Sequence, residues 1–144
     1  MTDHPAPMTW GIDHVGLSVR DLQQTVDFFR QALGWQVVGE RKDYPAAFVS
    51  DGHGVLTLWQ VADPAGAVAF DRRANVGLHH LALAVADEGG LAALHDRLSA
   101  WPGVVVEFAP QPVRGGPKQH FIIQEPGGLR LEFACDPRSW IEGV

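Results

Sequence analysis

Residues 11 to 21 read Gly-Ile-Asp-His-Val-Gly-Leu-Ser-Val-Arg-Asp, and residues 77 to 87 read Gly-Leu-His-His-Leu-Ala-Leu-Ala-Val-Ala-Asp. Each stretch has a His early in an alternation typical of a β-strand, and an Asp where a helix would begin. The two copies agree at matching positions, namely Gly11 and Gly77, His14 and His80, Leu17 and Leu83, Val19 and Val85, and Asp21 and Asp87. A repeat of this kind predicts two similar modules, each of which contributes one His.

The alternation also predicts which side of each strand faces the interior. Val15, Leu17 and Val19 share one face of the first strand, whereas His14 lies on the other face among small and polar residues. We expect the apolar face to pack against helices. The face that carries His14, and the equivalent face that carries His80, should then line a cavity.

Each repeat is followed by the same predicted order of elements, a helix and then three strands. We predict helices over residues 22–33 and from Asp87 to about residue 100, and strands over 10–20, 35–41, 46–50, 55–61, 78–85, 104–109, 121–124 and 129–134. The organisation is a flexible N-terminus (1–9), a first βαβββ module (10–61), a linker (62–76), a second βαβββ module (77–135), and a C-terminal tail (136–144) that is a helical turn or irregular. Modules of about 65 residues would be marginally stable alone, so we expect them to share a core or a sheet.

The bulk composition limits the classes of partner. A net charge of −6 on 144 residues argues against nucleic acid and against anionic membrane surfaces. No stretch approaches the roughly 18 apolar residues of a membrane span, and the first residues lack the features of a signal peptide. The single Cys135 allows no intrachain disulfide. We expect a cytoplasmic protein.

The last predicted strand carries a carboxylate where an apolar residue would be ordinary. Leu131 and Phe133 lie on its apolar face, which places Arg130 and Glu132 on the cavity side. A Glu in such a strand is costly unless it has a partner, and a metal, a cation or a His would serve. His14, His80 and Glu132 therefore form a candidate two-His-one-carboxylate set, which suits Fe, Mn, Ni, Co or Zn as divalent ions. Taken singly, each residue could instead be a hydrogen-bonded or solvated side chain.

Other side chains are candidates for contacts with a substrate. His120 begins a strand beside a Pro- and Gly-rich loop (110–117), where it could act as a general base or simply be exposed. Gln60 and Arg130 could line the cavity. Arg114 could contact an anionic substrate, or be a solvated residue of the loop.

The chain resembles the vicinal oxygen chelate superfamily, which includes glyoxalase I, extradiol dioxygenases, fosfomycin-resistance thiol transferases, methylmalonyl-CoA epimerase and bleomycin-resistance proteins. The resemblance extends from about Ile12 to Ala134. Its carriers are the first His strand, the helix with Phe28-Phe29 and Leu33-Gly34-Trp35, the second His strand, and the run Glu125-Pro126-Gly127-Gly128-Leu129-Arg130-Leu131-Glu132-Phe133. That run is similar to a closing Asp-Pro-x-Gly-x-x-x-Glu signature, with Glu125 in place of Asp.

The resemblance implies an α+β fold in which two βαβββ modules form a cup-shaped, incompletely closed mixed β-sheet barrel with helices outside. It implies a divalent metal held by His14, His80 and Glu132. In glyoxalase I a Glu supplies a fourth ligand, and the matching residue here is Thr57, a poor ligand that could contact substrate instead. It also implies a homodimer in which the cup can be completed across chains.

These features together predict a divalent-metal-dependent, glyoxalase-like enzyme of the lyase or isomerase type that acts on a small oxygenated substrate. The proton would be moved by Glu132 or His120. An Fe(II) extradiol-type dioxygenase or a thiol transferase is the enzymatic alternative. A non-catalytic protein that binds a small molecule or drug is the alternative from another class.

Overall fold

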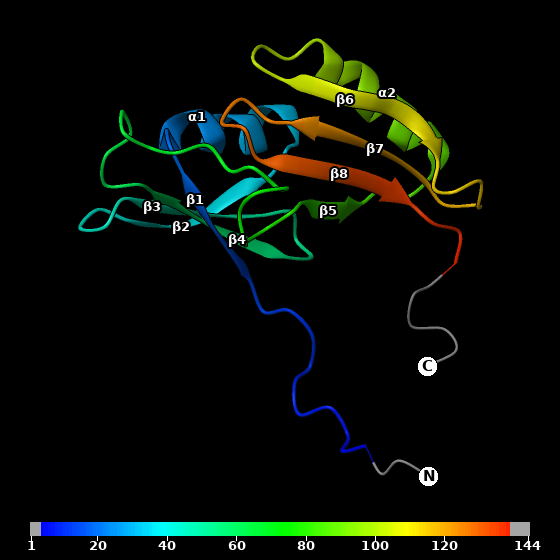
Figure 1. The fold of residues 1–144 in the computed structure, drawn as a ribbon, viewed down its shortest axis with the longest axis horizontal. Helices are drawn as coiled ribbons and strands as arrows, with labels where there is room; N and C mark the ends of the chain where they lie inside the picture. Colours follow the sequence, from blue (N-terminus) through cyan, green and yellow to red (C-terminus); the bar gives the residue numbers. More distant parts are fainter. Residues whose placement is uncertain (1–3, 139–144) are drawn as a thin grey trace.

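The computed structural model describes residues 4–138, which form two mixed β-sheets of four strands each (Figure 1). The first half of the chain contains β1 (Val15–Val19), α1 (Leu22–Asp27), η1 (Phe28–Ala32), β2 (Gln36–Arg41), β3 (Ala46–Ser50) and β4 (Val55–Gln60). The second half contains β5 (Leu81–Ala84), α2 (Glu88–Ser99), β6 (Val105–Pro112), β7 (Gln119–Gln124) and β8 (Arg130–Cys135).

The two sheets have the same topology, which confirms the repeated βαβββ order. The strand order is β1-β4-β3-β2 in one and β5-β8-β7-β6 in the other. In each sheet the first strand pairs in parallel with the last, and the remaining pairs are antiparallel. The sheets do not close into a barrel, so the predicted α+β class with an incompletely closed, cup-shaped arrangement is confirmed.

Both helices begin at the predicted Asp caps. The side chain of Asp21 accepts a hydrogen bond from the Gln24 amide, and that of Asp87 accepts one from the Gly90 amide, at 3.0 and 2.7 Å. Each cap satisfies an amide that the first helical turn would leave unpaired. The repeat in sequence is therefore a repeat of local structure.

One apolar core holds the modules together. Buried side chains of both halves, among them Phe29, Leu58, Leu98 and Phe133, belong to a single cluster. The helix α1 packs against β3 and β4, and α2 packs against the second sheet. The modules thus share a core, as their small size requires.

Several element boundaries differ from the predictions. The predicted helix 22–33 is α-helical only to Asp27 and continues as the π-helical η1. The strand predicted over 78–85 begins at Leu81, the first residue with a ladder partner on β8. The predicted loop 110–117 starts too early, because Gln111 and Pro112 still pair with β7.

The described ends of the chain lie outside the helices and strands. The N-terminal segment from residue 4 extends away from both sheets (Figure 1). Residues 136–138 are not helical, and the remainder of the predicted tail (139–144) and residues 1–3 lie outside the described part of the chain. Within residues 4–138, no helix has the length and apolarity that crossing a membrane requires.

Candidate functional site

Glu132 stands between two imidazole rings on the face of the second sheet that the helix does not cover. Its Oε2 lies 3.0 Å from Nε2 of His80, and its Oε1 lies 2.7 Å from Nδ1 of His120. Glu132 is only 8% exposed although its side chain is polar, and each of its carboxyl oxygens lies beside an imidazole nitrogen. Its neighbours Leu131 and Phe133 point the other way, into the core. The structure therefore brings together three of the predicted site residues.

The strand pairing explains this meeting. The strand β5 runs parallel to β8 with Ala82 opposite Glu132, and His80 immediately precedes β5. On the other side, β7 pairs His120 with Ala134, two residues beyond Glu132 on the same face. The centroid of the Phe108 ring lies 4.9 Å from that of the His120 ring.

His14 is not part of this cluster. Its side chain is 54% exposed, and its Nδ1 lies 2.7 Å from Oδ2 of Asp13. No three His, Cys, Asp or Glu side chains in the described range 4–138 are arranged so that they could hold a metal ion. The predicted set of His14, His80 and Glu132 is thus not assembled within one chain.

His80 and Glu132 nevertheless fit as two neighbouring ligands of a divalent ion. Ligand atoms that each lie about 2.0–2.2 Å from one ion are separated by about 3 Å when they are neighbours at about 90°, as in octahedral coordination. The His80 Nε2 to Glu132 Oε2 distance of 3.0 Å has this value. His120 faces the other carboxylate oxygen, so it is placed to support Glu132 rather than to share an ion with His80.

Thr57 lies on the open face of the first sheet, where its hydroxyl is already used. The indole Nε1 of Trp59 donates a hydrogen bond to Thr57 Oγ1 at 2.9 Å. Gly16 is paired with Thr57 across β1 and β4. The absence of a side chain at Gly16 gives the Thr57 hydroxyl the space it needs, because a Cβ there would lie 3.2 Å from the same oxygen. Next to them, the Trp59 ring contacts those of Tyr44 and Phe48, at centroid distances of 5.0 and 5.9 Å.

The remaining predicted contact residues are dispersed. The Oε1 of Gln60 accepts a hydrogen bond from the Leu22 amide at 3.1 Å, which places Gln60 at the start of α1. Arg114 is exposed in the turn between β6 and β7, with a positive φ of 50°. Arg130 uses its guanidinium for Glu107 and for His79.

Two residues beside the cluster, Glu107 and His79, were not singled out as site candidates from the sequence. Arg130 donates to both carboxylate oxygens of Glu107, at 2.8 and 3.1 Å, and these hydrogen bonds lower the pKa of Glu107. His79 lies next to His80. Its pKa is lowered mainly by partial loss of hydration and to a smaller extent by the positive charge of Arg130 nearby. The adjacent histidines were visible in the sequence, but nothing in the alternation indicated that Glu107 and Arg130 would pair.

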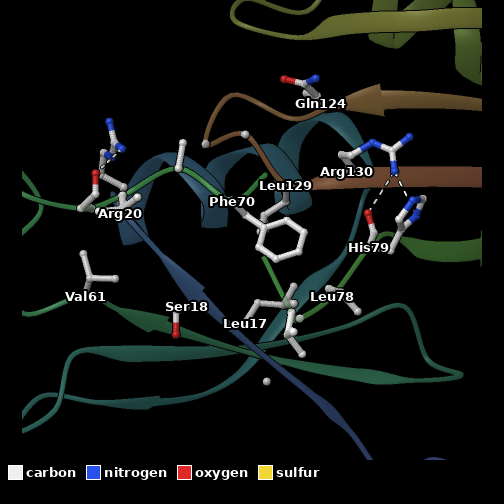
Figure 2. A pocket seen from close by; sticks show the side chains of 18 residues that line it. Leu17, Ser18, Arg20, Val61, Phe70, Leu78, His79, Gln124, Leu129 and Arg130 are labelled. Carbon is white, nitrogen blue, oxygen red and sulfur yellow. Dashed lines mark hydrogen bonds between the residues drawn. The ribbon is translucent and has the colours of Figure 1, made fainter. Parts of the chain in front are cut away.

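A cavity of about 440 Å³ lies between the modules, beneath the connecting segment (Figure 2). Its walls include Leu17 and Ser18 of β1, and Phe70 and Leu78 of the connection. His79 and Arg130 form one end of it, joined by the dashed hydrogen bonds in Figure 2. The cavity therefore reaches the residues that adjoin the Glu132 cluster.

Comparison with known proteins places this arrangement in a family. The chain is 27% identical to catechol-2,3-dioxygenase of Bacillus subtilis over 88% of its own length, but it spans only 43% of that protein. It is 28% identical to a probable lactoylglutathione lyase of Vibrio cholerae, with 83% of the chain and 86% of that protein covered. A solved glyoxalase/bleomycin resistance protein/dioxygenase domain from Frankia sp. superposes with a TM-score of 0.76 at 25% identity, over 88% of this chain and 98% of that one. Residues 11–133 match the sequence model of one family, and the chain therefore belongs to the Glyoxalase/Bleomycin resistance protein/Dioxygenase superfamily.

Proposed function

We propose that this protein is a divalent-metal-dependent enzyme of the glyoxalase type, which acts on a small oxygenated substrate. The observation that carries the proposal is the pair of His80 Nε2 and Glu132 Oε2, 3.0 Å apart on the uncovered face of the second sheet. In this proposal the nearly buried carboxylate and the imidazole nitrogen beside it would supply two ligands of the metal. Ni, Co, Mn, Zn and Fe are the candidate ions.

The third ligand in this proposal is His14 of a second copy of the chain. His14 is exposed and lies away from His80 and Glu132 in its own chain. Gly16 and Ser18 of β1, and Ala82 and Ala84 of β5, leave the uncovered sheet faces accessible. A homodimer in which the first sheet of one copy covers the second sheet of the other would bring His14 to the site. The cytoplasmic location also remains a prediction.

In such a site, different residues of the chain would bind the metal and transfer the substrate proton. A bound metal would supply Lewis-acid stabilisation of negative charge on a substrate oxygen. His120 would take up and return the substrate proton, because its Nδ1 is held by Glu132 Oε1 at 2.7 Å and its ring rests against Phe108. The contact with His120 also keeps the carboxylate of Glu132 oriented toward His80.

Metal content and thermal stability test this proposal directly. We expect protein purified without added metal to contain a transition ion, and its Tm to rise when Ni, Co, Mn, Zn or Fe is added to stripped protein. His80→Ala and Glu132→Ala should each abolish both effects. His53→Ala, at an exposed His in the turn between β3 and β4, is the control that should retain them. A wild-type protein without metal and without any Tm increase would contradict the proposal.

An Fe(II) dioxygenase is the second candidate function. Two observations favour it, namely the match to catechol-2,3-dioxygenase and the aromatic surface formed by Tyr44, Phe48 and Trp59 on the uncovered face of the first sheet. Activity that depends on Fe(II) and O₂, and that is lost on standing in air, would select this candidate. Turnover of a hemithioacetal without oxygen would select the lyase reaction instead.

A further inference from the structure

In the second sheet, a series of hydrogen-bonded side chains connects β6 to His80. It starts at Glu107, whose carboxylate accepts two hydrogen bonds from Arg130, at 2.8 and 3.1 Å. Both side chains are well shielded, with 12% of Arg130 and 18% of Glu107 exposed. A two-point contact of this kind fixes the plane of the guanidinium as well as its position.

The free edge of that guanidinium is directed at His79 (Figure 2). Its Nη1 donates to the His79 carbonyl oxygen at 3.0 Å and to His79 Nδ1 at 3.2 Å. The same Nδ1 lies 2.7 Å from Nδ1 of His80. Arg130 therefore fixes both the backbone and the ring of His79, and the His79 ring contacts the His80 ring.

The hydrogen-bond donors and acceptors of Arg130, His79 and His80 determine which ring nitrogens of the two histidines carry protons. A guanidinium has only donors, so His79 Nδ1 must be an acceptor and the His79 proton is on Nε2. A nitrogen 2.7 Å from that acceptor must carry a hydrogen, and this nitrogen is Nδ1 of His80. The Nε2 of His80 is then the nitrogen that faces Glu132 Oε2 across 3.0 Å, and because both atoms are acceptors, a metal ion or a second proton on His80 must lie between them.

We propose that Arg130 and His79 are positioning residues, which hold the proton of His80 on Nδ1 and so present Nε2 to the metal site. The metal part of this inference rests on the proposed function, whereas the proton assignment does not. It gives Arg130 a structural partner in place of the predicted contact with substrate. The adjacent histidines then have unequal roles, with His80 as ligand and His79 as its support.

The fold supplies a reason why Glu107 reaches Arg130. In the pairing of β6 with β7, Val106 is opposite Ile123 and Phe108 is opposite Ile122, so Glu107 is an extra residue without a partner on β7. This is a β-bulge, which redirects a side chain that a regular strand would place elsewhere. Arg130 can therefore reach across β7 to a carboxylate on β6.

The first experiment measures the ring nitrogens by ¹⁵N NMR in metal-free protein near pH 8, with the His80 signals assigned by their loss in His80→Gln. We expect Nδ1 of His80 to carry a proton in the wild type. In His79→Phe the acceptor is gone, and we expect the proton on Nε2, where it can be donated to Glu132. His79→Gln restores an acceptor and should restore the wild-type pattern. A wild-type His80 whose Nδ1 has no proton would overturn the inference.

The second experiment measures Zn²⁺ affinity by calorimetry. Loss of a residue that orients a metal-ligating His typically weakens binding by about 10-fold to 100-fold. We expect a loss of this size in His79→Phe and Arg130→Gln, recovery in His79→Gln, and no change in the control His53→Phe. Equal affinity in all variants would overturn the positioning role.

The two measurements separate this inference from the proposed function. If the wild type binds no Zn²⁺ but keeps the Nδ1 proton, the metal proposal fails and the proton assignment stands. If the wild type binds Zn²⁺ but Nδ1 of its His80 has no proton when metal-free, the metal proposal stands and the positioning inference fails.

Discussion

Glu125 is a fully buried carboxylate at the junction of the two modules. It is 1% exposed, and its Oε1 accepts a hydrogen bond from the Leu129 amide at 2.9 Å. Its Oε2, and the hydroxyl of Thr25 on α1, have no hydrogen-bond partner within residues 4–138. Burial raises the pKa of Glu125 above the ordinary value of 4.5, partly offset by the hydrogen bonds from Gly127 and Leu129.

The raised pKa makes stability depend on pH. The folded protein retains the Glu125 proton at pH values where the unfolded chain has lost it. The resulting contribution to stability is therefore complete below 4.5 and is lost as the pH rises through the folded value. Glu125→Gln cannot ionise, and its amide can donate toward Thr25. We expect it to be more stable than wild type near pH 8 by roughly 1–3 kcal/mol, the usual cost of an unpaired buried polar group, and this advantage should vanish near pH 4.

Urea unfolding at both pH values measures this difference. The exposed Glu40→Gln is the matched control, and we expect it to follow the wild type at each pH. An advantage of Glu125→Gln that is equal at pH 4 and pH 8 would show that ionisation of Glu125 does not limit stability.

Single residues also show how far a sequence can predict a site. The alternation of β8 placed Glu132 opposite the core, and the repeat placed His80 beside it, because both follow from the period of a strand. The contact between Glu107 and Arg130 could not be predicted, because one unpaired residue in β6 changes the facing of Glu107. Whether His14 meets His80 and Glu132 depends on how two sheets are oriented, and local patterns contain no such information.

At the scale of elements, the first sheet depends on a tight contact between β2 and β3. Gly39 lies beside the ring of Phe48, and a Cβ at this position would be 2.8 Å from the ring. We expect Gly39→Ala to lower the free energy of unfolding by about 1–3 kcal/mol, because the Phe48 ring must shift. The disturbed ring adjoins Trp59, so tryptophan fluorescence should change as well.

Gly54, between β3 and β4, provides the matched substitution. A Cβ there would have no neighbour within 4 Å, so Gly54→Ala should leave stability within about 0.5 kcal/mol of wild type. If both variants unfold at the same denaturant concentration, the contact between Gly39 and Phe48 is not a constraint on the sheet.

Elements were more predictable than their ends. The Asp caps, the helices and the βαβββ order of the elements along the chain follow from patterns that recur in both halves of the sequence. The extension of β6 to Pro112 and the change from α1 to η1 depend on neighbours that are distant in sequence or on small adjustments of backbone geometry. These are tertiary effects, which the hydrophobic period does not encode.

At the scale of the whole molecule, the proposed homodimer predicts complementation between subunits, because His14 would serve the site of the other copy. A dimer of one His14→Ala chain and one His80→Ala chain would contain one site with both substitutions and one site with neither. We therefore expect each variant alone to bind no metal, and the mixed dimer to bind about half the wild-type amount. Metal analysis after co-unfolding and refolding of the two variants measures this.

The alternative arrangement has a different outcome. If His14 served the site of its own chain, every site in the mixed dimer would lack one His, and mixing would restore no metal binding. His14→Ala mixed with Glu132→Ala should behave as the first mixture does, because His80 and Glu132 lie in the same chain, 3.0 Å apart.

The common core of the two modules has a consequence for the segment that joins them. Phe29 and Leu58 of one module and Leu98 and Phe133 of the other are buried in one cluster, whereas Val68 and Val76 of the connection are exposed. We therefore expect the two halves to stay associated without covalent continuity between them. A protease that nicks the connection should leave a complex of two fragments that migrates as one species. We also expect the two halves, when they are expressed from separate genes, to assemble in the cell.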